Sequence, residues 1–494
     1  MRAGTAVPEA TDEAAGRTDE ARAAGLRRVL ANGVSLLFAY ILPRGGLFVS
    51  AVVAARVLGA AGFGLYGTAA AFAVILSIVA TLGMLPLLVR EIARAPDRAG
   101  PLLRAADALK TVANAAMLGL LVVLAAGPLG YSTPVVAAAV MLGAAYAMGA
   151  YVENLAAYFQ AVERMHVWTA GSAVYGLITA VVGVAAVLIT RDIVWYAASP
   201  LAGQVAALVW LRRQLPPTVR AARTTVPDVL KLARAVVPFA AAFVALTVYS
   251  KIDVLLLAAW RTAEEVGVYT AAYKFVDLTR ALALVAAAAV YPRLSRATGG
   301  ARGAATGRVA ELLLLGALPA AGALWLARGI VIDTLYGAGY AAAAPVLGLL
   351  APALVPLTFN LFAGYSLAAA DRMRAVAIAY GAALVLNVGL NALLVPRYGA
   401  TGAAAAMLVS EITLSAGLAA VLRHTVGARF RLAALGTLAL AVAACAALPL
   451  STSNVPAQVA GFVVVVALLY WRTGVLPAHD VALLRAALRR PAHR

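Results

Sequence analysis

The segment Phe63-Gly64-Leu65-Tyr66 returns 203 residues later as Val266-Gly267-Val268-Tyr269. In both places a Gly-x-Tyr motif lies where a long apolar stretch begins. The same offset also relates an alanine and a phenylalanine after each motif: Ala69, Phe72, Ala272 and Phe275. A repeated motif at a fixed offset is typical of an internally duplicated fold.

A second pair of segments supports the duplication. Glu163-Arg164-Met165 and Asp371-Arg372-Met373 are 208 residues apart, and they follow the first pair in the same order. We therefore predict two halves of six helices each, repeated with the same membrane orientation. Parallel repeats related by an axis along the membrane normal are a transporter architecture, with the substrate site between the halves.

The composition is that of an all-α integral membrane protein. Hydrophobic residues make up 64% of the 494 positions, charged residues make up 12%, and the mean hydropathy is +0.91. Apolar stretches of roughly 17–25 residues are long enough to cross a bilayer as helices. We predict about fourteen: 33–57, 65–89, 109–127, 133–157, 166–190, 193–211, 235–260, 266–291, 309–327, 345–370, 375–395, 400–422, 432–450 and 455–471.

Basic residues alternate between the two sides of these helices. Of the 40 Arg and Lys residues, 31 lie on the side of the N-terminal tail, and the outer connections hold five. The positive-inside rule therefore predicts a plasma (inner) membrane protein with both termini in the cytoplasm. The expected parts are a tail (1–32), an N-lobe (33–211), a cytoplasmic linker (212–234), a C-lobe (235–424), helices 13 and 14 (425–472) and a second tail (473–494).

Several function classes do not fit this composition. The net charge of +19 is spread over short loops, which favours anionic membrane lipids and not nucleic acid as the partner. Cys445 is the one cysteine and only four histidines occur, so we expect no metal site. A phosphate-binding loop of the Gly-x-x-x-x-Gly-Lys-Ser/Thr type is absent from the sequence, and we expect no cofactor.

Charged residues inside the apolar stretches are the candidate functional residues. A charge near the bilayer centre costs about 2.5–3.5 kcal/mol on insertion scales, so such residues are usually functional. We predict that a cavity between the lobes is lined by Arg44, Glu153, Lys251, Lys274, Asp277 and Arg280.

Helix geometry arranges the basic members in two tiers. At about 1.5 Å per residue, Lys251 and Lys274 lie about 14 and 12 Å below the outer surface. Arg44 and Arg280 lie about 20 Å deep, close to the bilayer midplane. Asp253 is about 200° around a helix from Lys251, so we expect it to be the structural member of that pair.

Structural roles remain open for the same residues. Lys274, Asp277 and Arg280 could neutralise one another on one helical stripe. Arg44 follows a proline and precedes two glycines, so it could bind carbonyls freed by a bent helix. Glu153 and Glu411 could be interhelical hydrogen-bond partners. Glu163 and Asp371 are interpreted as repeat-related salt bridges or gate contacts.

The sequence also resembles a known family. The stretch 56–66, ending in Gly62-Phe63-Gly64-Leu65-Tyr66, is similar to the "LG…FGLY" connection of polysaccharide and O-antigen flippases. Those flippases belong to the multidrug/oligosaccharidyl-lipid/polysaccharide exporter (MOP) superfamily. Further similar stretches in the second half are 251–253, 267–269, 272–274, 291–295, 335–337, 344–345, Asn387, Asn391 and 396–403.

The resemblance implies a flippase and not an enzyme. Its substrate would be a lipid-linked oligosaccharide or polysaccharide precursor with a phosphate or pyrophosphate headgroup, and glycan-assembly enzymes would be partners. A multidrug-type cation antiporter of the same superfamily is the nearest alternative, but its cavity should be dominated by carboxylates. A membrane glycan polymerase or ligase is the alternative from another class. The longest outer connection, 328–344, holds only Asp333 as an acidic residue, which disfavours such an enzyme.

Overall fold

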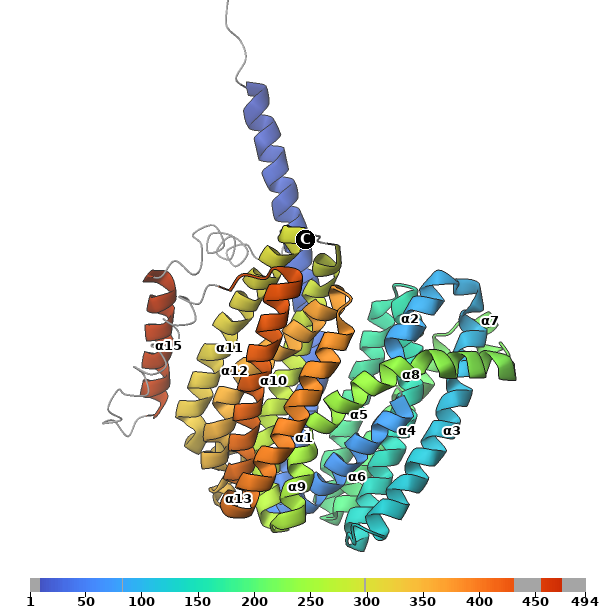
Figure 1. The fold of residues 1–494 in the computed structure, drawn as a ribbon, viewed down its shortest axis with the longest axis vertical. Helices are drawn as coiled ribbons and strands as arrows, with labels where there is room; N and C mark the ends of the chain where they lie inside the picture. Colours follow the sequence, from blue (N-terminus) through green and yellow to red (C-terminus); the bar gives the residue numbers. More distant parts are fainter. Residues whose placement is uncertain (1–8, 82, 297–298, 431–454, 473–494) are drawn as a thin grey trace, which may run out of the picture.

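The computed structural model describes residues 9–81, 83–296, 299–430 and 455–472. These residues form helices and short connections with no strand among them, so the predicted all-α fold is confirmed (Figure 1). Eight helical segments of this part of the chain are long and apolar enough to cross a membrane. Two of them, Arg44–Arg94 and Met373–Val426, are 51 and 54 residues long, and each covers two predicted spans. The chain is a multi-pass membrane protein.

The first half of the chain contains a long helix and five shorter ones with one 3₁₀ turn. Figure 1 shows the start of α1 projecting from the bundle. The bounds are α1 Glu9–Thr81, α2 Leu85–Arg94, η1 Pro96–Arg98, α3 Ala99–Ala126, α4 Thr133–Ala161, α5 Met165–Thr190 and α6 Ile193–Arg213.

The second half follows a short connecting helix, α7. Its bounds are α7 Pro217–Arg220, α8 Val226–Tyr249, α9 Ile252–Trp260, α10 Ala263–Arg296, α11 Gly299–Tyr336, η2 Ala338–Tyr340, α12 Ala343–Ala369, α13 Met373–Val426 and α15 Val455–Arg472.

Several predicted helices differ from the observed ones at their ends. Predicted spans 33–57 and 65–89 lie in α1 and α2, and α1 changes direction at Gly59, where φ is 69°. Spans 375–395 and 400–422 form α13, which bends at Gly399, where φ is 55°. Positive φ is accessible to glycine at little cost, so at both predicted junctions the helices change direction at a glycine without a longer loop. Span 235–260 is broken into α8 and α9, and span 432–450 lies outside the described residues.

The turns at the second repeated motif have the same backbone. Glu163 and Asp371 both have φ 58°, in the left-handed region. The next N–H donates to a carbonyl five residues earlier in both turns, Arg164 to Phe159 at 2.8 Å and Arg372 to Leu367 at 2.9 Å. This pattern is the Schellman helix end. Within the described chain neither acidic side chain forms a salt bridge, so that alternative is wrong, and their role as gate contacts stays a prediction.

The repeated glycines form the contact between the halves. A Cβ on Gly64 would lie 1.7 Å from the carbonyl oxygen of Ala263, and one on Gly267 would lie 1.8 Å from that of Ala60. Ala60 and Ala263 are themselves 203 residues apart. The contact between Gly64 and Ala263 is therefore repeated by their partners Gly267 and Ala60, which is the signature of a two-fold relation. The halves are parallel repeats, as predicted.

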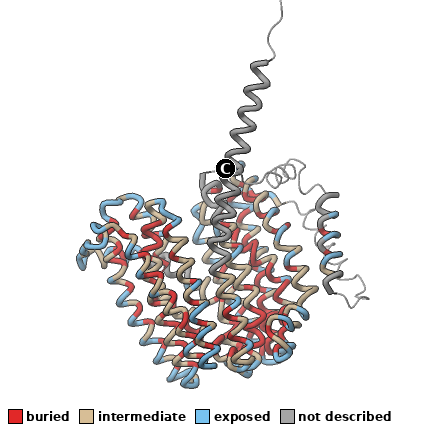
Figure 2. Tube along the Cα trace, turned by 180° about the vertical axis from the view of Figure 1, so that it is seen from behind, coloured by how far each residue is buried: buried red, intermediate tan, exposed pale blue. Residues whose placement is uncertain are grey.

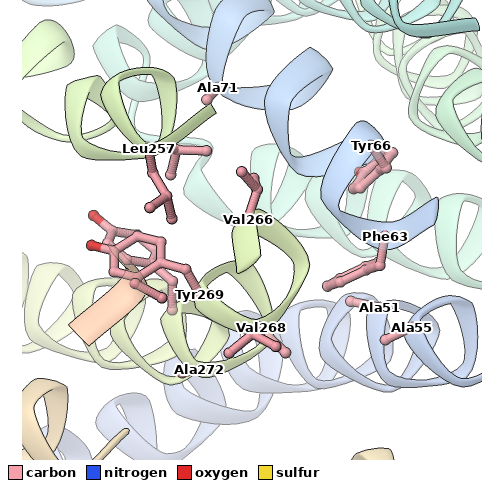
Figure 3. Packing of buried hydrophobic residues seen from close by; sticks show 14 of the residues in the cluster. Ala51, Ala55, Phe63, Tyr66, Ala71, Leu257, Val266, Val268, Tyr269 and Ala272 are labelled. Atoms are coloured by element: carbon pink, nitrogen blue, oxygen red, sulfur yellow. The ribbon is translucent and has the colours of Figure 1, made fainter. Parts of the chain in front are cut away.

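Among the described residues, the largest buried core lies at one end of the bundle and is shared between the halves. We call the end with residues 94–98, 161–165 and 213–225 the basic end, and the end with Gly59 and Gly399 the opposite end. The largest hydrophobic cluster joins both halves, with Phe63 and Tyr66 of α1 beside Val266 and Tyr269 of α10 (Figure 3).

Toward the basic end each half has its own core. One cluster includes Leu88, Leu103 and Phe159 of the first half, and another includes Leu314, Phe362 and Leu418 of the second. Figure 2 shows buried residues running through the inside of both groups of helices.

Helix α8 connects the two groups at the basic end. Leu232, near its start, packs in the core of the first half, and Tyr249, at its end, packs in the core of the second. Arg98 and Asp228 form a salt bridge of 3.3 Å between the 3₁₀ turn η1 and the start of α8. The lobe boundaries drawn from the sequence stay a prediction, because α8 contributes to both cores.

Candidate functional site

Two lysines converge on one carboxylate in the second half. Lys251 Nζ lies 2.9 Å from Asp277 Oδ1, and Lys274 Nζ lies 3.9 Å from Asp277 Oδ2. Lys274 and Asp277 are one turn apart on α10, whereas Lys251 comes from the junction of α8 and α9. The exposed fractions of the side chains are 19% for Lys251, 22% for Lys274 and 36% for Asp277, so this cluster is not sealed inside the protein. We call these three residues together with Arg280 the basic cluster.

A helix break positions Lys251. Helix α8 ends at Tyr249 and α9 begins at Ile252, and Lys251 lies between them with φ −144° and ψ 0°. The break frees the carbonyl of Ser250, which accepts a 2.7 Å hydrogen bond from the Tyr273 hydroxyl. The ammonium of Lys251 lies 4.2 Å from the centre of the Tyr273 ring, a cation–π contact. Discontinuous helices of this kind are typical of substrate sites in transporters.

Asp253 has the structural role that the sequence predicted. Its side chain is 3% exposed and accepts hydrogen bonds from the Tyr269 hydroxyl and, at 2.9 Å, from the Val254 amide. It occupies the first turn of α9, where a negative charge is favourable. The prediction placed Asp253 and Lys251 on one continuous helix, and the break between α8 and α9 makes that assumption wrong.

Arg280 lies one turn beyond Asp277 on α10. Its Nε is buried and has no hydrogen-bond acceptor among the described residues. It is close enough to interact electrostatically with Asp277 and with Glu411 of α13. An unsatisfied buried donor is uncommon in folded proteins and often marks a binding site.

Arg44 lies on α1, the helix of the first half that packs against α10. Phe48 contacts Phe275 edge-to-face, with ring centres 5.4 Å apart. Arg44 is one turn from Phe48 toward the basic end, and Arg280 is five residues from Phe275 in the same direction. At 1.5 Å per residue both arginines lie about 6–8 Å from this contact, at one level of the bundle. Arg44 is also close enough to Tyr175 of α5 to interact electrostatically.

Glu153 is not part of this cluster. Its Oε2 lies 2.9 Å from Lys110 Nζ, and the same ammonium donates a 2.8 Å hydrogen bond to the Ala150 carbonyl. The Lys110 side chain is completely buried between α3 and α4. The structure therefore places Glu153 in an ion pair inside the first half.

Glu411 is likewise an interhelical hydrogen-bond partner. It is 1% exposed and accepts a 2.7 Å hydrogen bond from Asn360 Nδ2. The amide oxygen of Asn360 in turn accepts from Ser415 Oγ at 2.7 Å. This network joins α12 to α13 next to Arg280.

The sequence analysis did not identify Lys110 as a buried functional residue, because Lys110 lies at the very start of the predicted span 109–127, next to an inner connection rich in basic residues. A signal was present: Asp107, Lys110, Thr111 and Asn114 follow the i, i+3, i+4, i+7 spacing of one helix face. All four bond to α4 in the structure.

No group of three His, Cys, Asp or Glu side chains able to hold a metal ion occurs among the described residues. Two cavities in the described part of the chain lie away from the basic cluster: one is between α3, α4, α6 and α7, and the other is beside Trp325 and Gln458. A cavity between the halves, lined by the six predicted residues, stays a prediction.

Comparisons with solved structures show the same fold. The lipid II flippase MurJ in an inward closed conformation has a TM-score of 0.69 and 14% identity, covering 91% of this chain and 100% of that chain. An inward-facing multidrug resistance MATE family transporter of the MOP superfamily has a TM-score of 0.57 and 14% identity, covering 78% and 96%. A MOP superfamily transporter from Pyrococcus furiosus has a TM-score of 0.54 and 15% identity, covering 81% and 94%.

The sequence itself matches a family. No curated relative matches the chain. The sequence model of the family described as "Polysaccharide biosynthesis protein" matches residues 29–298, which is more than half of the chain and runs from within α1 to the end of α10. The chain therefore belongs to the polysaccharide biosynthesis protein family and has the fold of the MOP superfamily transporters.

Proposed function

We propose that this protein is a flippase that moves lipid-linked oligosaccharide or polysaccharide precursors across the cytoplasmic membrane. The observation that carries the proposal is the basic cluster at the broken helix. Lys251 and Lys274 share a single carboxylate, and the buried Nε of the neighbouring Arg280 has no acceptor among the described residues.

The charge balance of the cluster suits an anion. The cluster itself holds three basic side chains and one carboxylate, Asp277. The nearby carboxylates of Asp253 and Glu411 already accept hydrogen bonds from neighbouring helices. Lipid-linked glycan precursors carry a phosphate or pyrophosphate between lipid and sugar. Guanidinium and ammonium groups bind such oxygens by charge-assisted hydrogen bonds, and Arg can do so with two parallel bonds.

The arrangement of the cores supports alternating access. The halves share a core at the opposite end and have separate cores at the basic end, so a rocking motion about the interface would expose the site to each side in turn. We place the basic end and both termini in the cytoplasm, following the distribution of Arg and Lys. In this orientation the precursor enters from the leaflet where glycan-assembly enzymes, the expected partners, make it.

We expect this protein to be a transporter without catalytic residues. A multidrug-type cation antiporter would need a carboxylate that is free to bind a cation. Asp277 is instead held by two lysines, which favours an anionic substrate.

A reconstituted flipping assay tests this function. The purified protein is placed in vesicles with a fluorescent polyprenyl-pyrophosphate-linked N-acetylglucosamine, and dithionite then bleaches only the outer leaflet. We expect nearly complete bleaching with the wild type and about half in protein-free vesicles. A labelled polyprenol without phosphate tests whether the substrate must carry the anionic group. Uptake of the cation ethidium tests the alternative of a multidrug-type cation antiporter.

Variants connect the activity to the cluster. The double variant Arg44→Ala, Arg280→Ala should lose flipping at an unchanged protein level, and Lys replacements should restore it only in part. Arg397→Ala, an exposed arginine at the opposite end, is the matched control. Wild-type flipping by the double variant would show that the two arginines are structural.

A further inference from the structure

A second basic site lies at the basic end of the first half, away from the cluster around Asp277. A cavity of about 340 Å³ opens between α3, α4, α6 and α7. Asp107 is the one acidic residue in its wall. Four arginines line it: Arg104, Arg212, Arg213 and Arg220.

Hydrogen bonds hold two of these arginines in place. Arg104 Nη2 donates to the Arg220 carbonyl at 2.5 Å, which ties α3 to the short helix α7. Arg220 Nη2 donates to the carbonyls of Arg213 and Leu215 at 3.1 Å each, which closes the turn between α6 and α7. The wall is therefore built by specific contacts and is more than a set of surface side chains.

The positive charge of this cavity is not neutralised from within. Among the described residues no carboxylate lies within salt-bridge distance of any of the four arginines. Asp107 accepts a 2.9 Å hydrogen bond from Asn154 Nδ2, so its carboxylate is engaged with α4. Arg212 and Arg213 are exposed at the mouth, and their guanidinium groups form no hydrogen bond in the described part of the chain, although Arg212 interacts electrostatically with Asp107. Four positive charges against one negative charge create a site for an anion.

The remaining lining is apolar and continues into the membrane-facing surface. Leu103, Leu155 and Val209 belong to the wall. Val209 is 45% exposed, and Val205, one turn toward the opposite end of α6, is 43% exposed. These valines form an apolar stripe that leads from the span of α6 to the arginines. A lipid acyl chain would be stabilised by burying apolar surface against this stripe, whereas a free anion would gain nothing from it.

We propose that this cavity binds the phosphate headgroup of an anionic phospholipid from the leaflet at the basic end. The phosphate lies between Arg104, Arg212 and Arg213, and one acyl chain lies along Val205 and Val209. Basic pockets between membrane helices on the cytoplasmic side are known to hold anionic headgroups. The site depends on the membrane orientation and not on the cargo, so it can be tested without a flipping substrate.

Native mass spectrometry of the full-length protein in detergent tests the site. Phosphatidylglycerol is added in increasing amounts, with phosphatidylcholine as the uncharged lipid and glycerol 1-phosphate as the free anion. We expect one retained phosphatidylglycerol, and an at least tenfold weaker affinity for phosphatidylcholine and for glycerol 1-phosphate. Equal binding of glycerol 1-phosphate would overturn the assignment to a lipid.

The variants are matched in charge. Arg212→Gln with Arg213→Gln removes two charges from the mouth and should weaken phosphatidylglycerol binding about tenfold or more, at about 1 kcal/mol for each charge. Arg223→Gln with Arg234→Gln removes two exposed charges outside the cavity and should leave binding unchanged. Equal weakening in both double variants would mean that only the general surface charge attracts the lipid.

A third variant tests the apolar stripe. Val209→Gln keeps all four arginines and should weaken phosphatidylglycerol binding several-fold while leaving glycerol 1-phosphate binding unchanged. Unchanged lipid binding by this variant would contradict the position proposed for the acyl chain. Thermal unfolding curves confirm that each variant is folded.

Discussion

At the scale of single residues, the most buried charge described in this chain is Lys110. Its ammonium has a carboxylate at 2.9 Å and a carbonyl at 2.8 Å, and no water-exposed surface. A buried ion pair contributes little net stability compared with apolar residues, but an isolated buried charge is costly. The pair should therefore behave as a unit.

We expect Glu153→Leu to lower the free energy of unfolding by about 3–5 kcal/mol, because it leaves the Lys110 ammonium without a carboxylate. The double variant Lys110→Met, Glu153→Leu should recover most of this loss. Thermal unfolding of the detergent-purified protein measures both. A double variant less stable than either single one would show that the pair stabilises the fold by itself.

At the scale of helices, the junction of α1 and α10 determines how closely the halves approach. Gly64 and Gly267 allow backbone-to-backbone contact, and a methyl group at either position would overlap a carbonyl oxygen of the other half. The two contacts are related by the repeat, so equivalent substitutions should have equivalent effects.

Gly64→Ala and Gly267→Ala should each weaken the closed contact at the opposite end by about 1–3 kcal/mol, as expected for overpacking. Spin labels at Ala61 and Glu264, both exposed and 203 residues apart, should then report a longer distance than in the wild type. All spin-labelled proteins also carry Cys445→Ala, which removes the one native cysteine. Gly45→Ala is the control, since a Cβ there meets nothing within 4 Å. An unchanged distance in both variants would mean that this contact does not limit closure.

Sequence patterns are sufficient to predict some of the helix spans. The spans of α4, α5, α6 and α12 follow from apolar length, because a connection with polar residues or glycine separates each from its neighbour. The predicted spans also separate at Gly59 and at Gly399, where the structure bends α1 and α13. The break at Ser250–Lys251 was not predicted: it lies inside the single predicted span 235–260, and only packing determines where a helix in a bundle bends.

At the scale of the whole molecule, the orientation in the membrane is the property to test first. We expect residues 216–225 to face the cytoplasm, because most of the 40 basic residues lie on their side of the bundle. Single cysteines introduced there into a Cys445→Ala background should react with an impermeant maleimide only after the membrane is opened. A cysteine at Arg397 should react in intact cells. Labelling of 216–225 in intact cells would reverse the orientation.

The sequence by itself determined the class of this protein, its duplication and its basic end. These properties depend on composition and on repeated local motifs, which are independent of how distant residues meet. Lys251 and Lys274 could be placed at similar depths from helix rise alone, since depth is a property of each helix.

Only the tertiary structure decided which charges pair. Lys251 and Asp277 are 26 residues apart, and Lys110 and Glu153 are 43 apart, and each contact depends on the rotation of one helix against another. Side-chain packing over the whole interface determines that rotation, and no single motif encodes it. The structure therefore separated Glu153, which neutralises a buried lysine inside one half, from the lysines that meet at the broken helix.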